Sequence, residues 1–125
     1  MNIAEIAEEL SLEEGDCLEI MELFLETGMD DIRKLACAIE RGDMKQAAMA
    51  AHAVKGASAN LRLLDLSEMA RQIEVSIHRE QWHDRCQETL HLLQVGMISF
   101  ADDLFRQREP SPLFGRLNQP PRIGI

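Results

Sequence analysis

The chain has 125 residues, a length typical of one domain, and 46% of them are hydrophobic, which allows one modest core. Its formal net charge of −9 argues against a nucleic-acid-binding protein, because such proteins carry a basic surface. The three cysteines are scattered and no leader pattern is present, so we expect reduced thiols and a cytoplasmic location. We expect no membrane span, because no apolar run approaches about 18–20 residues.

A short N-terminal helix is predicted for residues 1–10. Its apolar residues lie on one side at helical spacing, and they are Ile3, Ile6 and Leu10. Ser11 follows, with Glu14 three residues later, as a capping box requires. We therefore expect Ser11 to cap the second helix.

The second predicted helix is amphipathic, and its apolar pattern is interrupted at Gly28. Arg41 and Gly42 form a typical C-terminal signal, because glycine readily adopts the left-handed conformation that ends a helix. The apolar residues before and after the interruption are Leu18, Met21, Phe24, Leu25, Met29, Ile32, Leu35, Ala36 and Ile39.

Asp43 is placed to cap a third helix. In that helix, residues alternately four and three apart share one face, and the small size of several of them predicts close packing against a neighbouring helix. These residues are Ala47, Ala51, Val54, Ser58 and Leu61.

Two further helices are predicted, from about Asp65 to Arg79 and from about Trp82 to Phe105, joined by "HREQWHD". The inward residues of the first are Leu66, Met69, Ala70, Ile73 and Ile77. Those of the second are Cys86, Leu90, Leu93, Met97, Phe100 and Leu104.

No segment has the character of a strand, so the sequence predicts an all-α fold. We expect an antiparallel four-helix bundle with a short extra N-terminal helix over residues 1–108. Four prolines occur after Arg108, and they predict a flexible C-terminal tail over residues 109–125.

The third predicted helix has an unusual exposed side around His52. If Val54 faces the core, His52 lies about 160° away and points to solvent. Lys55 and Gly56 share its side, three and four residues later. A helical side chain leans toward the N-terminus, so any side chain at position 56 would lie over the imidazole. Gly56 leaves His52 uncovered, although glycine inside a helix costs about 1 kcal/mol relative to alanine.

The neighbouring residues suit an anionic ligand such as a phosphoryl group. Lys55 places a compact positive charge within one turn of the ring. Ala48 and Ala59 are small, and Lys45 lies two turns before His52, so we assign these three to partner docking. Ser58 falls on the buried face, and we expect a structural hydrogen bond from it. The plainer interpretation is a surface histidine beside a glycine that serves close packing.

The segment "HAVKGASANL" resembles the HxxKGxS motif of histidine-containing phosphotransfer (HPt) domains, through His52, Lys55, Gly56 and Ser58. The flanks are similar too: "LACAIERGDMKQAAMAAH" looks like the family's two helices with a Gly-Asp joint. "LSEMARQIE" looks like its next helix, which usually ends in a glutamate near Glu74. The resemblance covers roughly residues 12–105. The family often has an "NLGA"-like turn where this chain has "NLRLL". Arg62 stands in place of the glycine of that turn, and we interpret it as a solvated substitution.

The resemblance implies a phosphorelay intermediate. His52 would accept a phosphoryl group from the aspartyl-phosphate of a receiver domain and pass it to another receiver, assisted by Lys55 and Gly56. The implied partners are response-regulator receiver domains and a hybrid sensor histidine kinase, with no nucleic acid and no membrane. Mg²⁺ would belong to the receiver, and the chain would need no cofactor of its own. No nucleotide-binding motif is present, so we expect a phosphocarrier and not an enzyme with its own ATP site.

Three other interpretations remain open. The first is a metal site formed by His78, His83, Cys86 and His91, although His91 lies about 140° round the helix from Cys86. The second is a helical interaction module without chemistry. The third is the phosphoryl-accepting domain of a chemotaxis-type histidine kinase, which shares the motif.

Overall fold

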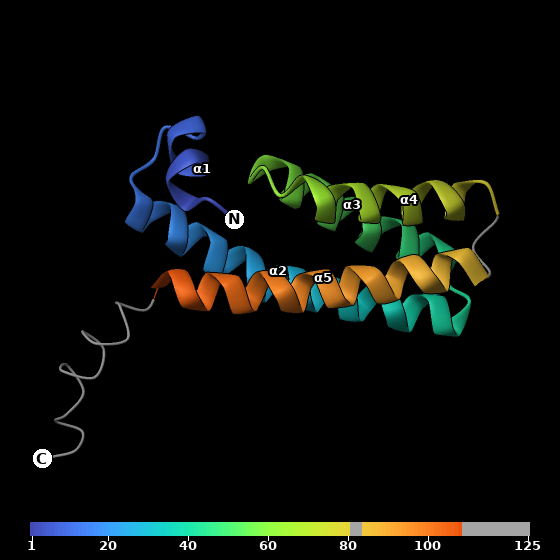
Figure 1. The fold of residues 1–125 in the computed structure, drawn as a ribbon. Coiled ribbons are helices and arrows are strands. Elements are labelled where there is room, and N and C mark those ends of the chain that lie inside the picture. Colours follow the sequence, from blue (N-terminus) through green and yellow to red (C-terminus); the bar gives the residue numbers. More distant parts are fainter. Residues whose placement is uncertain (81–83, 109–125) are drawn as a thin grey trace, which may run out of the picture.

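The computed structural model describes residues 1–80 and 84–108, and no strand occurs among them (Figure 1). The predicted all-α fold class is confirmed for this part of the chain. Three predictions fall on residues outside the described ones: the start of the last helix at Trp82, the suggested metal ligand His83 and the flexible tail over residues 109–125. The described helices are α1 (Ile3–Glu9), α2 (Glu14–Arg41), α3 (Met44–Asn60), α4 (Leu64–His78) and α5 (Asp84–Arg108).

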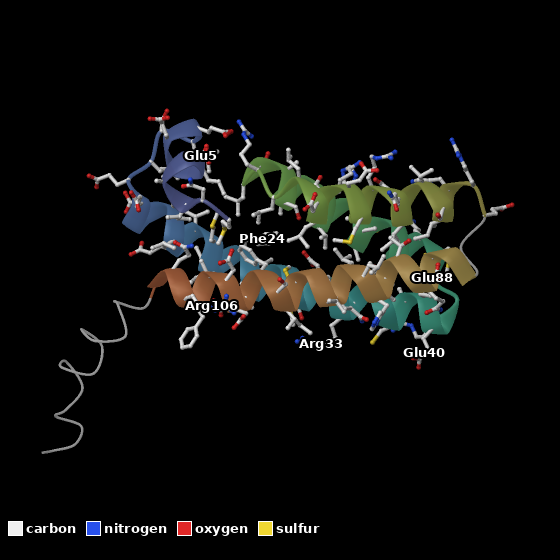
Figure 2. The ribbon with its side chains drawn as sticks, in the orientation of Figure 1. Glu5, Phe24, Arg33, Glu40, Glu88 and Arg106 are labelled. Carbon is white, nitrogen blue, oxygen red and sulfur yellow. The ribbon has the colours of Figure 1, made fainter. Side chains whose placement is uncertain are left out.

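The four long helices pack in a closed ring. Helix α3 contacts α2 and α4, α5 contacts α4 and α2, and α1 packs against α2. Figure 1 shows α1 at one end of the long helices. Figure 2 shows Phe24 directed between the helices, where its ring meets that of Phe100 edge to face at 5.6 Å between centroids. None of the described helices is both long enough and apolar enough to cross a membrane.

The core contains most of the predicted apolar faces. All five inward residues of α3 and all six of α5 are buried, as predicted, and in α4 only Met69 is half-exposed. In α2 the buried predicted residues are Met21, Phe24, Ile32, Leu35 and Ile39, while Leu18, Leu25 and Ala36 pack at the edge of the core.

Helix α2 runs without a break through Gly28, where the apolar pattern of the sequence is interrupted. Gly28 is buried, and a Cβ atom there would overlap the terminal methyl group of Met97 on α5. The glycine therefore leaves room for the end of the Met97 side chain. Since the helical pattern continues through it, Met29 lies on the outer side and is 38% exposed, so its predicted place in the core is wrong.

The predicted capping of α2 by Ser11 is wrong as well. Ser11 has a φ of 57°, and its N–H donates to the carbonyl of Glu8 at 3.1 Å. It therefore closes the end of α1 and does not start α2. Helix α2 begins at Glu14, after Glu13 in the N-cap position, and that side chain makes no capping hydrogen bond.

The joint between α2 and α3 is built as predicted. Gly42 takes the left-handed conformation, with φ 76°, and its N–H donates to the carbonyl of Ile39 at 3.1 Å. Asp43 then caps α3, because its Oδ1 accepts the N–H of Gln46 at 3.1 Å. These two contacts set where α3 begins and help to set which of its faces meets the core.

Arg62 occupies the turn between α3 and α4 with a φ of 62°, a conformation that glycine adopts more readily. Helix α3 ends before it, at Asn60. The Arg62 side chain is exposed, as predicted, and its Nε donates to Glu9 Oε2 at 3.2 Å. Arg62 thus links this turn to the N-terminal region through an ion pair with Glu9.

Candidate functional site

His52 lies in α3 on the side opposite the core. Its side chain is 67% exposed, whereas Val54, two residues later, is buried. Two side-chain hydrogen bonds hold this part of α3. Ser58 Oγ donates to the carbonyl of Val54 at 2.6 Å, which is the structural bond expected of Ser58, and Ser67 Oγ of α4 donates to the carbonyl of Lys55 at 3.0 Å.

The carboxylate of Glu74, on α4, binds both His52 and Lys55. Its Oε2 lies 3.0 Å from His52 Nδ1, and its Oε1 accepts from Lys55 Nζ at 2.7 Å. His78 Nε2 lies 3.9 Å from Oε2, at the edge of ion-pair distance. The Glu74 side chain is only 14% exposed, so this carboxylate is held between the two helices.

Glu74 is ionised at neutral pH. Burial alone would raise its pKa, but the hydrogen bonds from Lys55 and His52, together with their charges, outweigh burial and lower it. Because its folded pKa is depressed, Glu74 stabilises the fold above its unfolded pKa. That contribution is lost as the pH falls through the folded pKa.

An ionised carboxylate can only accept hydrogen bonds, so Nδ1 of His52 carries the proton. In the neutral ring, the lone pair is then on Nε2. Among residues 1–80 and 84–108, no group binds Nε2. The site therefore presents an exposed imidazole whose Nε2, in the neutral ring, can act as a nucleophile.

The surface beside His52 carries small residues and no side chain at position 56, as the sequence indicated. A Cβ atom built on Gly56 meets nothing within 4 Å, so this glycine is not a packing contact. Ala48 and Ala59 are half-exposed, and Lys45 is exposed. The docking roles assigned to these three residues stay predictions.

We expect Gly56→Ala to stabilise the protein by up to about 1 kcal/mol while slowing phosphoryl transfer, because the new methyl group would lie toward His52. Gly56→Gln should fold normally and slow transfer further. Chemical denaturation and single-turnover labelling measure the two effects. Normal transfer in both variants would show that the open surface is incidental.

Two glycines of α2 provide matched controls for this prediction. Gly15 also has open space beside it, so Gly15→Ala should be tolerated without any change in transfer. Gly28→Ala should gain less stability than Gly15→Ala and should also leave transfer unchanged, because its methyl group requires the flexible end of the buried Met97 side chain to move.

The suggested metal site has no support in the described residues. No group of three or more His, Cys, Asp or Glu side chains that could hold a metal ion occurs in the parts of the chain that the structure describes. Cys86 is buried within the apolar face of α5, and burial raises the pKa of its thiol. His83 lies outside the described residues.

Glu74 is the main site residue that the sequence did not assign. Residue patterns within α3 placed His52, Lys55 and Gly56, but the partner of Nδ1 comes from a different helix. The only sequence signal was the resemblance of "LSEMARQIE" to a family helix that ends in a glutamate.

Comparison with known proteins gave one match. A family model described as "Hpt domain" matches residues 19–103, which is more than half of the chain and contains His52, Lys55, Gly56 and Glu74. No curated protein and no solved structure matched the chain.

Proposed function

The chain belongs to the Hpt domain family, and we propose that it is a phosphorelay intermediate that takes a phosphoryl group onto His52 from one receiver domain and gives it to another. The observation that carries this proposal is the bond between His52 Nδ1 and Glu74, which in the neutral ring places the lone pair on Nε2 of an exposed side chain. A surface histidine without a chemical role would not need an ionised, half-buried partner on a second helix.

In the proposed forward step, Nε2 of His52 attacks the phosphorus of the receiver's aspartyl-phosphate in line with the leaving oxygen. The N–P bond forms as the P–O bond breaks, and the aspartate leaves as a carboxylate with the electron pair. Nδ1 keeps its proton throughout, so the product ring carries a positive charge. Glu74 faces that charge and stabilises it.

Lys55 can bind the transferred phosphoryl group in the same step. An ammonium group has three N–H donors, and only one is directed at Glu74 Oε1 in the free protein. A second donor can bind a phosphoryl oxygen while the ion pair persists. The same groups act in reverse when a receiver takes the phosphoryl group back.

The proposal assigns the remaining requirements to the partners. Mg²⁺ and most of the charge stabilisation belong to the receiver, and a hybrid sensor histidine kinase supplies the phosphoryl group to the relay in the cytoplasm. The chain acts as a phosphocarrier, without an ATP site of its own. We also propose that α2–α5 form the antiparallel four-helix bundle expected from the sequence, which their ring of packing contacts supports.

Incubation with receiver domains from the same cell, loaded with labelled acetyl phosphate, tests the proposal. We expect label to move from at least one receiver to this chain. The labelled product should be acid-labile and stable to alkali, as phosphohistidine is. Receivers with their acceptor aspartate replaced provide the control.

Two outcomes would favour the other interpretations. Labelling by ATP and a kinase domain, without labelling by any receiver, would indicate the accepting domain of a chemotaxis-type kinase. No label from either source would indicate a helical interaction module without chemistry.

A further inference from the structure

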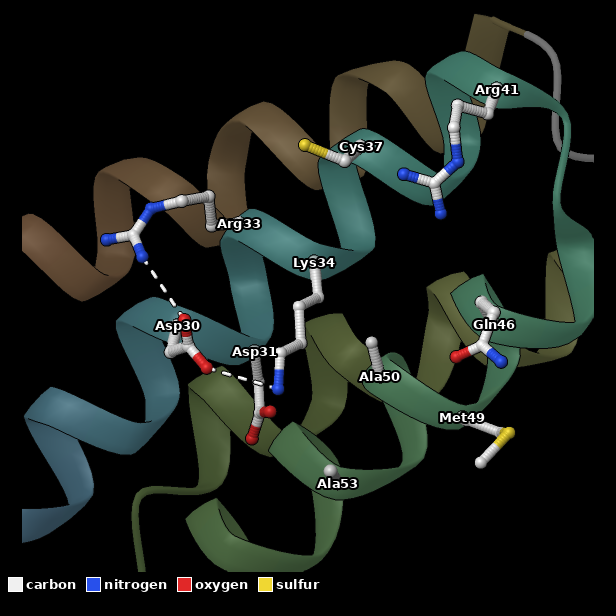
Figure 3. A pocket seen from close by; sticks show the side chains of 10 residues that line it. All are labelled: Asp30, Asp31, Arg33, Lys34, Cys37, Arg41, Gln46, Met49, Ala50 and Ala53. Atoms are coloured by element: carbon white, nitrogen blue, oxygen red, sulfur yellow. Dashed lines mark hydrogen bonds and ion pairs between the residues drawn. The ribbon is translucent and has the colours of Figure 1, made fainter.

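A furrow runs between α2 and α3 next to the exposed side of His52. One hollow in it, of about 500 Å³, is lined by charged residues of α2 and by Met49, Ala50 and Ala53 of α3 (Figure 3). A second hollow, of about 300 Å³, is lined mainly by apolar residues, among them Ile20, Leu23, Phe24 and Leu61. Asp31 lines both hollows, so it lies where they meet.

Asp31 differs from its neighbour Asp30 in making no hydrogen bond or ion pair among the described residues, although the charge of Lys34 acts on it. Asp30 Oδ1 accepts from Arg33 at 3.2 Å, and its Oδ2 pairs with Lys34 at 3.2 Å. Within the described part of the chain, Asp31 makes neither a hydrogen bond nor an ion pair. Figure 3 shows its carboxylate directed from α2 toward α3.

The free protein does not favour a charge at this position. Asp31 is half-buried, and burial raises its pKa, with the charge of Asp30 acting in the same direction and that of Lys34 opposing. A partly desolvated carboxylate that makes no hydrogen bond or ion pair lowers the stability of a fold. A cationic group that entered the furrow would remove this disadvantage.

A receiver that docks over His52 can reach the furrow, because residues of α3 beside His52 line it. In-line transfer requires the reacting atoms to come within about 3–3.5 Å of each other. Ala53 directly follows His52 and Met49 lies one turn before it, and both line the charged hollow. Leu23, beside the apolar hollow, is 62% exposed and offers the same partner an apolar contact.

We propose that Asp31 is a specificity-determining residue that accepts a lysine or arginine side chain from a receiver helix lying in the furrow, while apolar side chains of that helix fill the neighbouring hollow. This inference rests on the proposed phosphorelay function. A receiver without the cation would leave Asp31 desolvated and unpaired on docking, and such a mismatch discriminates against wrong partners.

The test compares Asp31→Asn with Glu26→Gln, using a purified receiver that labels the wild-type chain; Glu26 is an exposed acid of α2 that lines neither hollow. We expect Asp31→Asn to weaken receiver binding about tenfold by titration calorimetry, a change typical of a partly buried charge pair. The rate of transfer at saturating receiver should stay normal, and the melting temperature should hold or rise. Glu26→Gln removes one negative charge from the same helix outside the furrow and should change binding less than about twofold.

A charge reversal sharpens the test. Asp31→Lys should bind the wild-type receiver still more weakly, and replacing the matching lysine or arginine of the receiver with glutamate should restore binding. Wild-type affinity in Asp31→Asn, or equal losses in the Glu26 and Asp31 variants, would overturn the inference while leaving the proposed function intact. If no receiver labels the wild-type chain, the proposed function fails, and the inference fails with it.

Discussion

We expect His52→Gln to abolish labelling by receiver domains while leaving the fold intact. Glutamine has no nucleophilic ring nitrogen, so no N–P bond can form at this position. The His52 side chain is mostly exposed, and the hydrogen bond that it makes in the structure is the one to Glu74. Losing such an exposed pair costs at most about 1 kcal/mol, so the melting temperature should fall by only a few degrees.

Two other histidines provide matched controls for this experiment. His78 and His91 are exposed residues of α4 and α5, and His78 even approaches the same carboxylate. His78→Gln and His91→Gln should both be labelled. Label that persists in His52→Gln, or that disappears only in one of the two controls, would show that the acceptor has been assigned to the wrong residue.

Periodicity predicted the buried faces of the helices because each face depends on residues three and four apart in one helix. Val54 and Met97, for example, are buried as predicted. One error arose where a neighbouring helix decides the outcome. Gly28 interrupts the apolar pattern in the sequence, but in the structure it is buried against Met97 of α5, so the buried face passes through the glycine and Met29 lies outside the core.

The same distinction applies to the site. The exposure of His52 follows from the burial of Val54 in the same helix, and so does the position of Gly56 on its side. The contact with Glu74 joins residues 22 apart in sequence. It depends on the relative rotation of α3 and α4, which the order of residues within either helix does not determine. Asp31 is a similar case, because its environment is formed jointly by α2 and α3.

The structure makes Glu74 the residue whose loss should damage transfer most after His52. Removing a hydrogen bond to a charged group costs about 1.5–3 kcal/mol. If that energy is expressed in the transition state, Glu74→Ala should slow transfer about 10- to 150-fold. Glu74→Gln keeps an oxygen that can accept from Nδ1 but lacks the charge that faces the phosphorylated ring, so a smaller loss of about tenfold is expected.

Glu68→Gln is the matched control on α4. The Glu68 carboxylate binds Arg71 and Gln72, which lower its pKa to about 2, and it contacts neither His52 nor Lys55. This variant removes the same charge from the same helix, and transfer should stay within about twofold of normal. Equal losses in the Glu68 and Glu74 variants would mean that the overall charge of α4 matters and the bond to Nδ1 does not.

Stability measurements separate the chemical role of Glu74 from a structural one. Because the folded pKa of Glu74 is lowered, its carboxylate stabilises the fold at neutral pH, and this advantage disappears as the pH falls through that pKa. Glu74→Gln should therefore be less stable than wild type at pH 7 and equally stable in acid, by denaturant titration at both values. Its slow transfer at pH 7 should persist at temperatures where the variant is fully folded. If transfer becomes normal under those conditions, Glu74 only holds α3 against α4, and the orientation of His52 has another origin.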